Sequence, residues 1–251
     1  MMQRNHSIYL FYFCLSAFFF TTGACNQSND SLSPQQQLLS LLTKALKGKD
    51  TGAIMENIDR TYQDDLGGPG RLEDDLRRIF SVYGKLRFKI REKSKIDEDT
   101  FRIAYTIQGR GLFFSGQSIA HFKITPMGPL FVSGVFTEMR AVLEILRQRR
   151  LALERNSVDM LDSLISMDYK PKKGTRQEFI SHLHEVLSSQ GRVGIVVQDV
   201  KISIDKSRAK VVQSLLKLEI EDEATTREKR ILEHIVLRKE GTRWRILQGI
   251  G

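Results

Sequence analysis

The amino-acid sequence predicts an α+β protein with two repeated domains, each made of N-terminal helices packed on an antiparallel sheet. Three observations support this fold class. Helical patterns are followed by long runs of alternating apolar residues. This order occurs twice along the 251 residues. The apolar run at the N-terminus has the length of a targeting signal and is therefore left out of the fold.

The targeting segment begins with one formally charged side chain, Arg4, within residues 1–7, and residues 8–20 carry no charge. This run has the length of a signal-peptide core and is shorter than the ~20 residues that span a bilayer. Gly23 and Ala24 are small residues of the kind that a signal peptidase requires before its cut. We therefore expect residues 1–24 to be a signal peptide that is cleaved between Ala24 and Cys25.

The stretch FFFTTGAC, residues 18–25, resembles the lipobox of bacterial lipoproteins, although Thr22 stands where such sequences most often have Leu. The resemblance implies that Cys25 carries lipid, palmitate included, and anchors the chain to a membrane. Asn26, in place of Asp, implies the outer membrane, facing the periplasm. An ordinary secretory signal with a chance cysteine is the alternative. Because Cys14 belongs to the signal, the mature chain has no thiol for a disulfide.

The domain boundaries follow from composition. Residues 25–32 are polar and predict a lipidated cysteine followed by a flexible tether. The first domain then covers residues 33–136 and the second residues 137–251. A helix within residues 141–156 opens the second domain, and no linker rich in Gly, Pro or Ser separates the halves, so we expect the domains to pack rigidly.

Capping patterns predict where the main helices begin. A serine or threonine N-cap is followed three residues later by Gln or Glu, and in the first half a proline occupies the first helical position. Gly48 ends the first helix, and an apolar stripe predicts a second helix over residues 71–80. The capping residues are Ser33, Pro34 and Gln36 in the first half and Thr175 and Glu178 in the second.

The two halves align with each other. A shift of 107 residues places Tyr62 on Tyr169, and downstream a shift of 113 places His121 on His234. A longer hairpin in the second half accounts for the difference. We interpret the alignment as a repeat in the order of helix, turn and strand. Further matches are Leu76 with Leu183, Gly84 with Gly191, Gly128 with Gly241 and Phe131 with Trp244.

Strand signals fill the second part of each half, where apolar residues alternate with polar ones. The final strand of the chain is RWRILQGI, residues 243–250. The alternating sets of the first half are Leu86, Phe88 and Ile90, then Phe101, Ile103, Tyr105 and Ile107, then Ala120, Phe122 and Ile124. Those of the second half are Val193, Ile195 and Val197, then Val212, Ser214, Leu216, Leu218 and Ile220, then residues 231–237.

A helical region followed by long strands that end in GTRWRIL, residues 241–247, resembles the nuclear transport factor 2-like (cystatin-like cone) superfamily. The resemblance covers both halves and rests on the order of elements and the last strand. It implies a curved sheet that wraps a helix and leaves a conical pocket. Members of the superfamily include isomerases, dehydratases, ligand binders and docking modules, so the fold by itself implies no chemistry.

Candidate pocket residues carry groups that can move a proton. His121 and His234 occupy matching strand positions, and histidine serves as a general base near neutral pH; structural or surface histidines are the alternative. An Asp beside a Tyr at the mouth of a cone suits proton abstraction, whereas Asp near Gly or Pro is ordinary turn chemistry. The possible pocket residues are Tyr62, Asp65, His121, Tyr169, His234 and Trp244.

We expect no cofactor and no metal. His182 and His184 are two residues apart on a helix and point to different faces. The stretches GGPG and GRGLFFSG lack the pattern of a phosphate-binding loop, and the motifs of serine hydrolases and zinc proteases are absent from the sequence. Phe113 and Phe114 either form an exposed tip that binds a partner or fold back onto the sheet.

The net charge of +9 points to an acidic partner. Export excludes nucleic acid, so anionic lipid heads or acidic envelope polymers are the expected attractants. A solvated helix face is the preferred interpretation of the arginines in residues 147–150, and attraction of an acidic partner is the alternative. The possible basic patch consists of Arg147, Arg149, Arg150, Lys170, Lys172 and Lys173.

These observations favour a non-catalytic binding or interaction module of the cell envelope. Its expected partner is an envelope protein or a lipid-like or anionic ligand, and the membrane is reached through the N-terminal lipid. An isomerase- or hydrolase-like enzyme that uses an Asp or His base in one cone pocket is the alternative, and a spacer in an envelope assembly is a third reading.

Overall fold

The computed structural model describes residues 32–220 and 226–249. The expected signal peptide, its cleavage site at Ala24 and Cys25, and the lipidation of Cys25 lie outside the described residues, as does the tether except for Leu32. In the described part, no helix combines the length and the apolar character needed to cross a bilayer.

The first half begins with three helices, α1 (Pro34–Gly48), α2 (Thr51–Met55) and α3 (Pro69–Tyr83). The Ser33 capping box is confirmed, since Ser33 and Gln36 exchange both hydrogen bonds. The expected end of the helix at Gly48 is confirmed, and Lys49, which follows it, takes the left-handed conformation at φ +60°. Four strands follow: β1 (Arg87–Lys95), β2 (Thr100–Gly109), β3 (Leu112–Thr125) and β4 (Gly128–Ser133).

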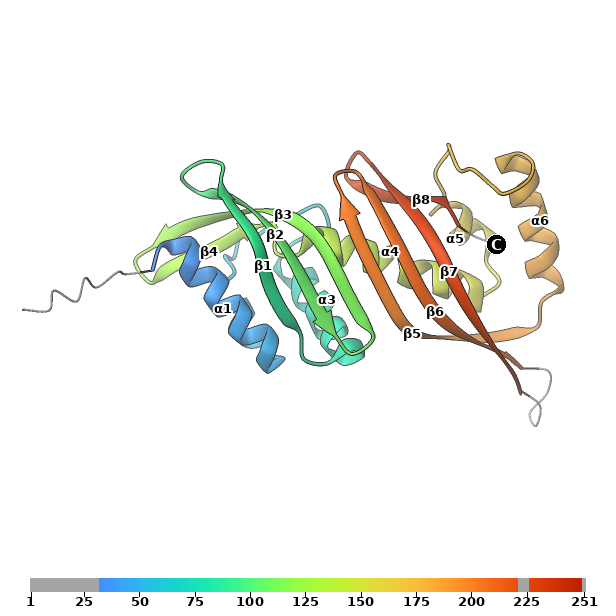
Figure 1. The fold of residues 1–251 in the computed structure, drawn as a ribbon, viewed down its shortest axis with the longest axis horizontal. Coiled ribbons are helices and arrows are strands. Elements are labelled where there is room, and N and C mark those ends of the chain that lie inside the picture. The colour runs from blue at the N-terminus through green and yellow to red at the C-terminus, as the bar shows by residue number, and fades with distance from the viewer. Residues whose placement is uncertain (1–31, 221–225, 250–251) are drawn as a thin grey trace, which may run out of the picture. The chain divides into compact units, whose positions relative to one another are not determined.

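The second half has the same order of elements (Figure 1). Its helices are α4 (Thr137–Glu154), α5 (Val158–Asp162) and α6 (Arg176–Ser189), and the Thr175 capping box of α6 is confirmed. Its strands are β5 (Arg192–Asp205), β6 (Arg208–Ile220), β7 (Thr226–Glu240) and β8 (Arg243–Gln248). The fold class predicted from the sequence is therefore confirmed: in each half, helices precede and pack on a curved antiparallel sheet.

Within the described residues the strands form one sheet, because β3 pairs with β5. This pairing is parallel and joins Leu112–Ser115 to Val200–Ser203, whereas all other named strand pairs are antiparallel. We call it the seam. Gly111 permits it: the residue has φ +67°, and a Cβ atom there would lie 2.3 Å from the backbone oxygen of Gln198.

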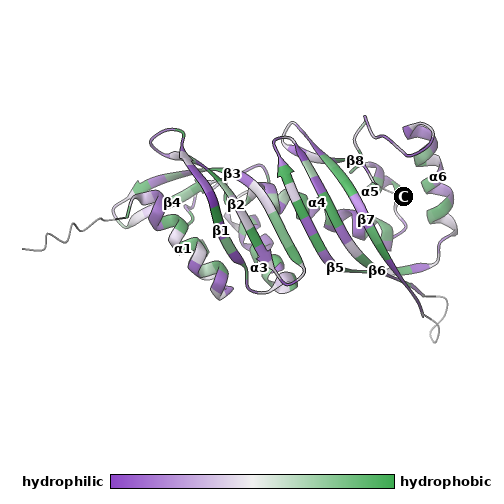
Figure 2. Ribbon diagram, viewed as in Figure 1, coloured by the Kyte–Doolittle hydropathy of each residue, from purple (hydrophilic) through white to green (hydrophobic). Residues whose placement is uncertain are grey.

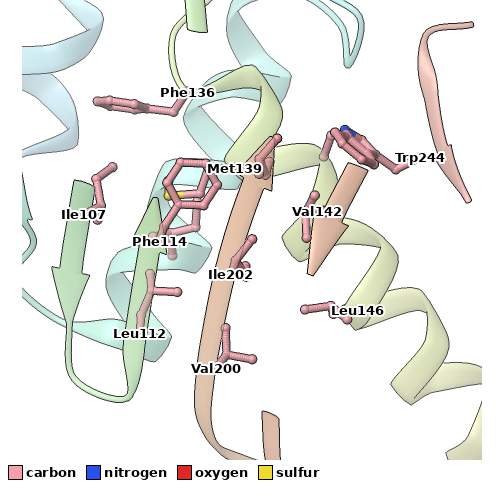
Figure 3. Close-up of a cluster of buried hydrophobic side chains, with 14 of the residues drawn as sticks. Ile107, Leu112, Phe114, Phe136, Met139, Val142, Leu146, Val200, Ile202 and Trp244 are labelled. Atoms are coloured by element: carbon pink, nitrogen blue, oxygen red, sulfur yellow. The ribbon is translucent and has the colours of Figure 1, made fainter. Parts of the chain in front are cut away.

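Helix α4 packs across the seam and contacts β3, β5 and β8. Its apolar side chains Met139, Val142 and Leu146 meet Phe114, Ile202 and Trp244 in one buried cluster (Figure 3). Strand residues alternate between this core and the outer face of the sheet, which gives the strands their alternating colours in Figure 2. The core is therefore continuous from one half to the other.

The register of the repeat differs from the sequence alignment in its second part. Strand β3 is irregular at His121, whose partner is Ser133, and β7 is irregular at Val236, whose partner is Gln248. Glycines with positive φ, Gly134 and Gly249, follow these partners and lie against Ile119 and His234. The structural shift is therefore 115 residues. The alignments of His121 with His234, Gly128 with Gly241 and Phe131 with Trp244 were two residues off.

Two alternating sets also differ from the sequence reading. In β6 the buried residues are Ala209, Val211, Gln213 and Leu215, so Val212, Ser214, Leu216 and Leu218 of the expected set lie on the outer face. Both sets are apolar, and cross-strand pairing of Val211 with Ile202 and Ile235 decides which faces the core. At the β3–β4 hairpin, Ile124 is 70% exposed, whereas Ala120 and Phe122 of the same set are buried.

Candidate junction cleft

A hollow with a largely apolar lining opens beside the seam. Strand β3 reaches β5 only from Leu112 and Val200 onward, so the earlier part of β5 has no strand on that side. Helix α3, helix α4 and the β2–β3 turn enclose the remaining space, which we call the junction cleft. Its cavity is about 440 Å³. Small-molecule pockets commonly occupy ~300–1,000 Å³.

The body of the junction cleft is apolar. Ile79 and Val82 line it from α3, and Leu143 and Leu146 from α4. Strand β5 forms the opposite wall with Ile195, Val196, Val197 and Val200. Val82 and Val196 are 46% and 48% exposed, so each of the two walls leaves a large apolar side chain open to solvent. Apolar surface of this kind gains free energy when a ligand covers it.

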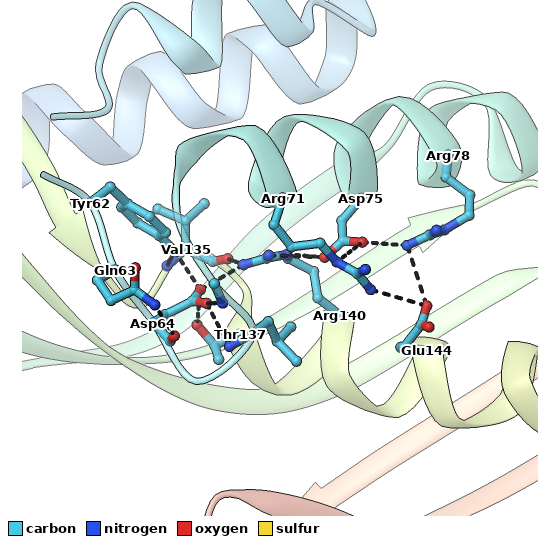
Figure 4. A network of polar contacts seen from close by, with 12 residues as sticks. Tyr62, Gln63, Asp64, Arg71, Asp75, Arg78, Val135, Thr137, Arg140 and Glu144 are labelled. Atoms are coloured by element: carbon cyan, nitrogen blue, oxygen red, sulfur yellow. Dashed lines mark hydrogen bonds and ion pairs between the residues drawn. The ribbon is translucent and has the colours of Figure 1, made fainter. Parts of the chain in front are cut away.

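Buried ion pairs hold the two helical walls together (Figure 4). The Arg140 side chain is fully buried and binds Asp75 through Nε and Nη2, at 3.0 and 2.9 Å. Its Nη1 donates to Asp64 at 2.6 Å. Burial opposes ionisation of Asp64, but the Arg140 charge and hydrogen bonds, one of them from Tyr62, hold its pKa below the usual 3.8. Arg140 thus fixes α4 against α3 and the 63–68 loop.

A second carboxylate, Glu144, gathers arginines at the wall of the cleft. Arg147 donates to it twice, at 2.9 and 2.7 Å, and Arg71 and Arg78 lie 3.4 Å from its Oε2. Arg78 also pairs with Asp75. Burial opposes ionisation of Glu144, but the hydrogen bonds from Arg147 and Gln148 keep its pKa below the usual range. Each of these arginines therefore already has a carboxylate partner in the protein.

Three other polar side chains line the cleft and can form further hydrogen bonds. Arg150 reaches Glu154 only at 4.0 Å, and its Nε has no hydrogen-bond partner among the described residues. Arg110 donates one bond, to the carbonyl of Val82. The Tyr83 hydroxyl has no hydrogen bond within residues 32–220 and 226–249. Burial raises the Tyr83 pKa against the opposing charge of Arg150, so the phenol keeps its proton at neutral pH.

At one side the cleft meets a buried polar cluster of the second half. Arg149 binds Glu233 through two bonds of 2.9 and 2.6 Å, and Gln213 donates to the same carboxylate at 2.7 Å. Gln213 lines the cleft, and its Oε1 is buried without a partner in the described part of the chain. Buried amide oxygens are normally satisfied, so this oxygen marks an unfilled hydrogen-bonding position.

A second, smaller hollow of about 220 Å³ lies at the opposite end of the seam. It is polar and is lined by Asp65, Ser118, His121 and Glu138, among others. The His121 Nδ1 lies 2.9 Å from the Thr100 hydroxyl. Lys239 forms ion pairs with both acids, at 3.4 Å from Asp65 and 2.6 Å from Glu138.

Comparison with known proteins gives partial structural similarities. No protein-family model matches the chain, and no curated protein sequence does. Among solved structures, the chain is similar to a candidate dehydratase of the nuclear transport factor 2-like family from Streptomyces avermitilis, at 15% identity and a TM-score of 0.41. The match covers 45% of this chain and 93% of that one.

Two further structures have the same degree of similarity. A candidate ketosteroid isomerase from Shewanella frigidimarina matches at 16% identity and a TM-score of 0.38, over 43% of this chain and 92% of that one. A protein of unknown function with a cystatin-like fold from Nostoc punctiforme matches at 12% identity and a TM-score of 0.39, over 51% and 91%.

The possible pocket residues do not form one pocket. Asp65 and His121 share the small polar hollow. Tyr62 is buried behind it and donates to Asp64 at 2.6 Å, and Trp244 is buried and donates to Glu138 at 2.8 Å. In the second half, Tyr169 is buried against Phe179, with ring centroids 4.8 Å apart, and His234 is exposed on the outer face of β7.

The basic patch is also divided. Arg147 and Arg150 line the junction cleft, whereas Arg149 is buried against Glu233 and does not belong to a solvated surface. Lys170, Lys172 and Lys173 are exposed in the segment before α6, away from these arginines in the chain. One residue along a helix turns the side chain by about 100°, which separates Arg149 from its neighbours.

Phe114 is buried in the core, while Phe113 lies on the outer face with the Lys201 ammonium 5.7 Å from its ring centre. His182 is exposed and lies 3.8 Å from Glu185. The described residues contain no group of three or more His, Cys, Asp or Glu side chains suited to a metal ion.

The sequence reading did not identify the junction cleft. Its lining comes from α3, the β2–β3 turn, α4, β5 and β6, and the seam that assembles them was not predicted. Two features of the sequence bear on the cleft: Val82 is an apolar residue at the end of an amphipathic helix, and α4 carries several arginines. Neither feature is typical of a helix that packs against a closed apolar core.

Proposed function

We propose that this chain is a non-catalytic, membrane-anchored binding module of the cell envelope, and that its ligand is lipid-like and anionic. The ligand occupies the junction cleft. The observation that carries the proposal is the combination of an apolar body with arginines at its border in one cavity of about 440 Å³. Pockets with mostly apolar walls and a few oriented polar groups are typical of small-molecule sites.

The charge of the residues that line the cleft determines the sign of the charge that a ligand should carry. Five arginines and two acids line the cleft, so the cavity keeps an excess of positive charge. A cleft with low-dielectric walls concentrates such a field and favours an anion. The anchor, which would place the module at the outer membrane facing the periplasm, rests on the lipobox resemblance of residues 18–25.

The test is native mass spectrometry on a version that starts at residue 25 and carries Cys25→Ser. Residues from Leu32 onward form one compact unit, so the cleft is expected to be intact in this version. A co-purifying acidic amphiphile, lost in Leu143→Arg, supports the proposal. An apo mass that stays unchanged when lipid extracts are added contradicts it.

A second candidate function is catalysis in the small polar hollow, because Asp65 and His121 share it. We rank it second, since Lys239 engages Asp65 and Glu138, and the neighbouring Asp64 has a lowered pKa that makes it a weak base. Turnover of enolisable ketones or esters that is lost in His121→Gln and kept in His182→Gln would establish it.

A further inference from the structure

We infer that the junction cleft selects single-chain acids: one acyl or alkyl chain that ends in a carboxylate or a phosphate monoester. The inference rests on the proposed function and narrows its ligand class. The head group binds Arg150 and Arg110 with the Tyr83 hydroxyl, and the chain lies along the apolar walls.

The head-group position follows from which donors are free. Among the cleft arginines, Arg140, Arg147 and Arg78 are paired with buried carboxylates of the protein. Arg150 and Arg110 have no such partner, since Arg150 has only the 4.0 Å ion pair with Glu154 and Arg110 binds a carbonyl. An incoming anion therefore gains most at these two guanidinium groups, where bonds to a charged acceptor are strong.

Tyr83 joins the two arginines into one site. Its backbone oxygen accepts from the Arg110 amide at 2.8 Å, and the Arg150 charge acts on its phenol. The phenol keeps its proton at neutral pH, so the Tyr83 hydroxyl adds a third donor to the lining of the cleft. A neutral head group would leave Arg150 uncompensated and gains less.

The size of the cavity limits the chain. At about 440 Å³ the cleft lies in the lower part of the range for small-molecule pockets, a size that suits one chain better than two. The apolar part of the walls consists of aliphatic side chains, from Ile79 and Val82 to Leu143 and Val200. A flexible aliphatic chain fills such a groove without requiring directed polar contacts.

The experiment compares dodecanoate, dodecyl phosphate, dodecanol and a dilauroyl phosphatidic acid by displacement of a fluorescent fatty acid. The matched variants are Arg150→Gln in the cleft and Arg155→Gln, an exposed arginine near the end of the same helical segment that does not line it. Tyr83→Phe removes only the hydroxyl. Circular dichroism confirms that each variant keeps the fold.

We expect both single-chain acids to bind at least about tenfold more tightly than dodecanol and than the two-chain lipid. Arg150→Gln weakens the acids by about tenfold and leaves dodecanol within about twofold, while Arg155→Gln changes neither. A preference for one acid over the other identifies the head group as carboxylate or phosphate.

The failures of the two proposals are distinguishable. If none of the four probes binds, the proposed function is wrong. If dodecanol or the two-chain lipid binds as tightly as dodecanoate, or if Arg150→Gln weakens dodecanol equally, the cleft binds amphiphiles without selecting single-chain acids, and this inference is overturned while the proposed function stands.

Discussion

At the scale of single residues, the charged side chain of Arg140 joins helix α4 of the second half to the first half. Its side chain is fully buried, and the carboxylates of Asp64 and Asp75 are only 4% and 3% exposed. A buried pair contributes little net stability compared with apolar residues, but loss of one partner leaves an unpaired buried charge. The network is therefore sensitive to single substitutions.

Arg140→Met is expected to lower the free energy of unfolding by about 3–5 kcal/mol, because Asp64 and Asp75 lose their cation. Urea unfolding measures the change. Arg77→Met serves as the control: Arg77 is exposed and pairs with Glu73 on the helix surface, so its loss should cost less than about 1 kcal/mol. Equal costs for the two variants would show that the Arg140 network does not hold the halves together.

The same network predicts how stability depends on pH. The folded-state pKa of Asp64 is held below 3.8, so its contribution to stability is present above that value and is lost as the pH falls through the folded pKa. We expect the free energy of unfolding to fall on acidification below about pH 4. In Asp64→Asn this part of the acid dependence should disappear. The free energy of unfolding of both proteins is measured with urea at several values between pH 2 and 6. If it falls with decreasing pH equally in Asp64→Asn and in the parent protein, the assignment to Asp64 is wrong.

At the scale of elements, the seam depends on a residue without a side chain. Gly111 has a left-handed φ and sits against the Gln198 carbonyl, where a Cβ atom would lie at 2.3 Å. The Gly111 oxygen accepts the Val200 amide at 2.7 Å, the first bond across the seam. A side chain at this position would separate β3 from β5.

Gly111→Ala is expected to destabilise the protein by at least about 2 kcal/mol, from the left-handed backbone and the displaced strand together. Gly70→Ala is the matched control, because a Cβ atom there meets nothing within 4 Å and its φ is ordinary. That variant should gain up to about 1 kcal/mol. Chemical unfolding of both variants compares the two glycines directly. If Gly111→Ala leaves the free energy of unfolding unchanged, the close approach of Gly111 to β5 at the seam is ruled out.

Local signals made the elements predictable, and long-range pairing made the rest unpredictable. Ser33 and Thr175 identify their helices because a cap and its partner are three residues apart. The buried face of β6 was not readable, since Val211 and Val212 belong to two apolar sets and only the neighbouring strands choose between them. The junction cleft could not be predicted from the sequence for the same reason. The seam pairs Leu112 with Val200, and no local sequence pattern relates these two residues.

At the scale of the whole molecule, one core extends through both halves, because α4 packs on β3, β5 and β8. Residues 32–249 should therefore unfold in one cooperative transition. Trp244, the only tryptophan, lies in the second half and reports on it by fluorescence, while far-UV circular dichroism reports on both halves. Coincident midpoints are expected, and a dichroism transition that precedes or follows the Trp244 transition would show that the halves unfold separately.

The seam also orders the events of folding in time. Antiparallel pairs within each half connect neighbours in the chain, whereas β3 and β5 can meet only after three intervening helices have been placed. Contacts between distant positions form slowly, because the chain must be closed over a long loop before they contribute. The junction cleft takes its walls from both sides of this late contact, so it is among the last features to exist. The time at which a refolding protein begins to bind the ligand would then report the final docking of the two halves.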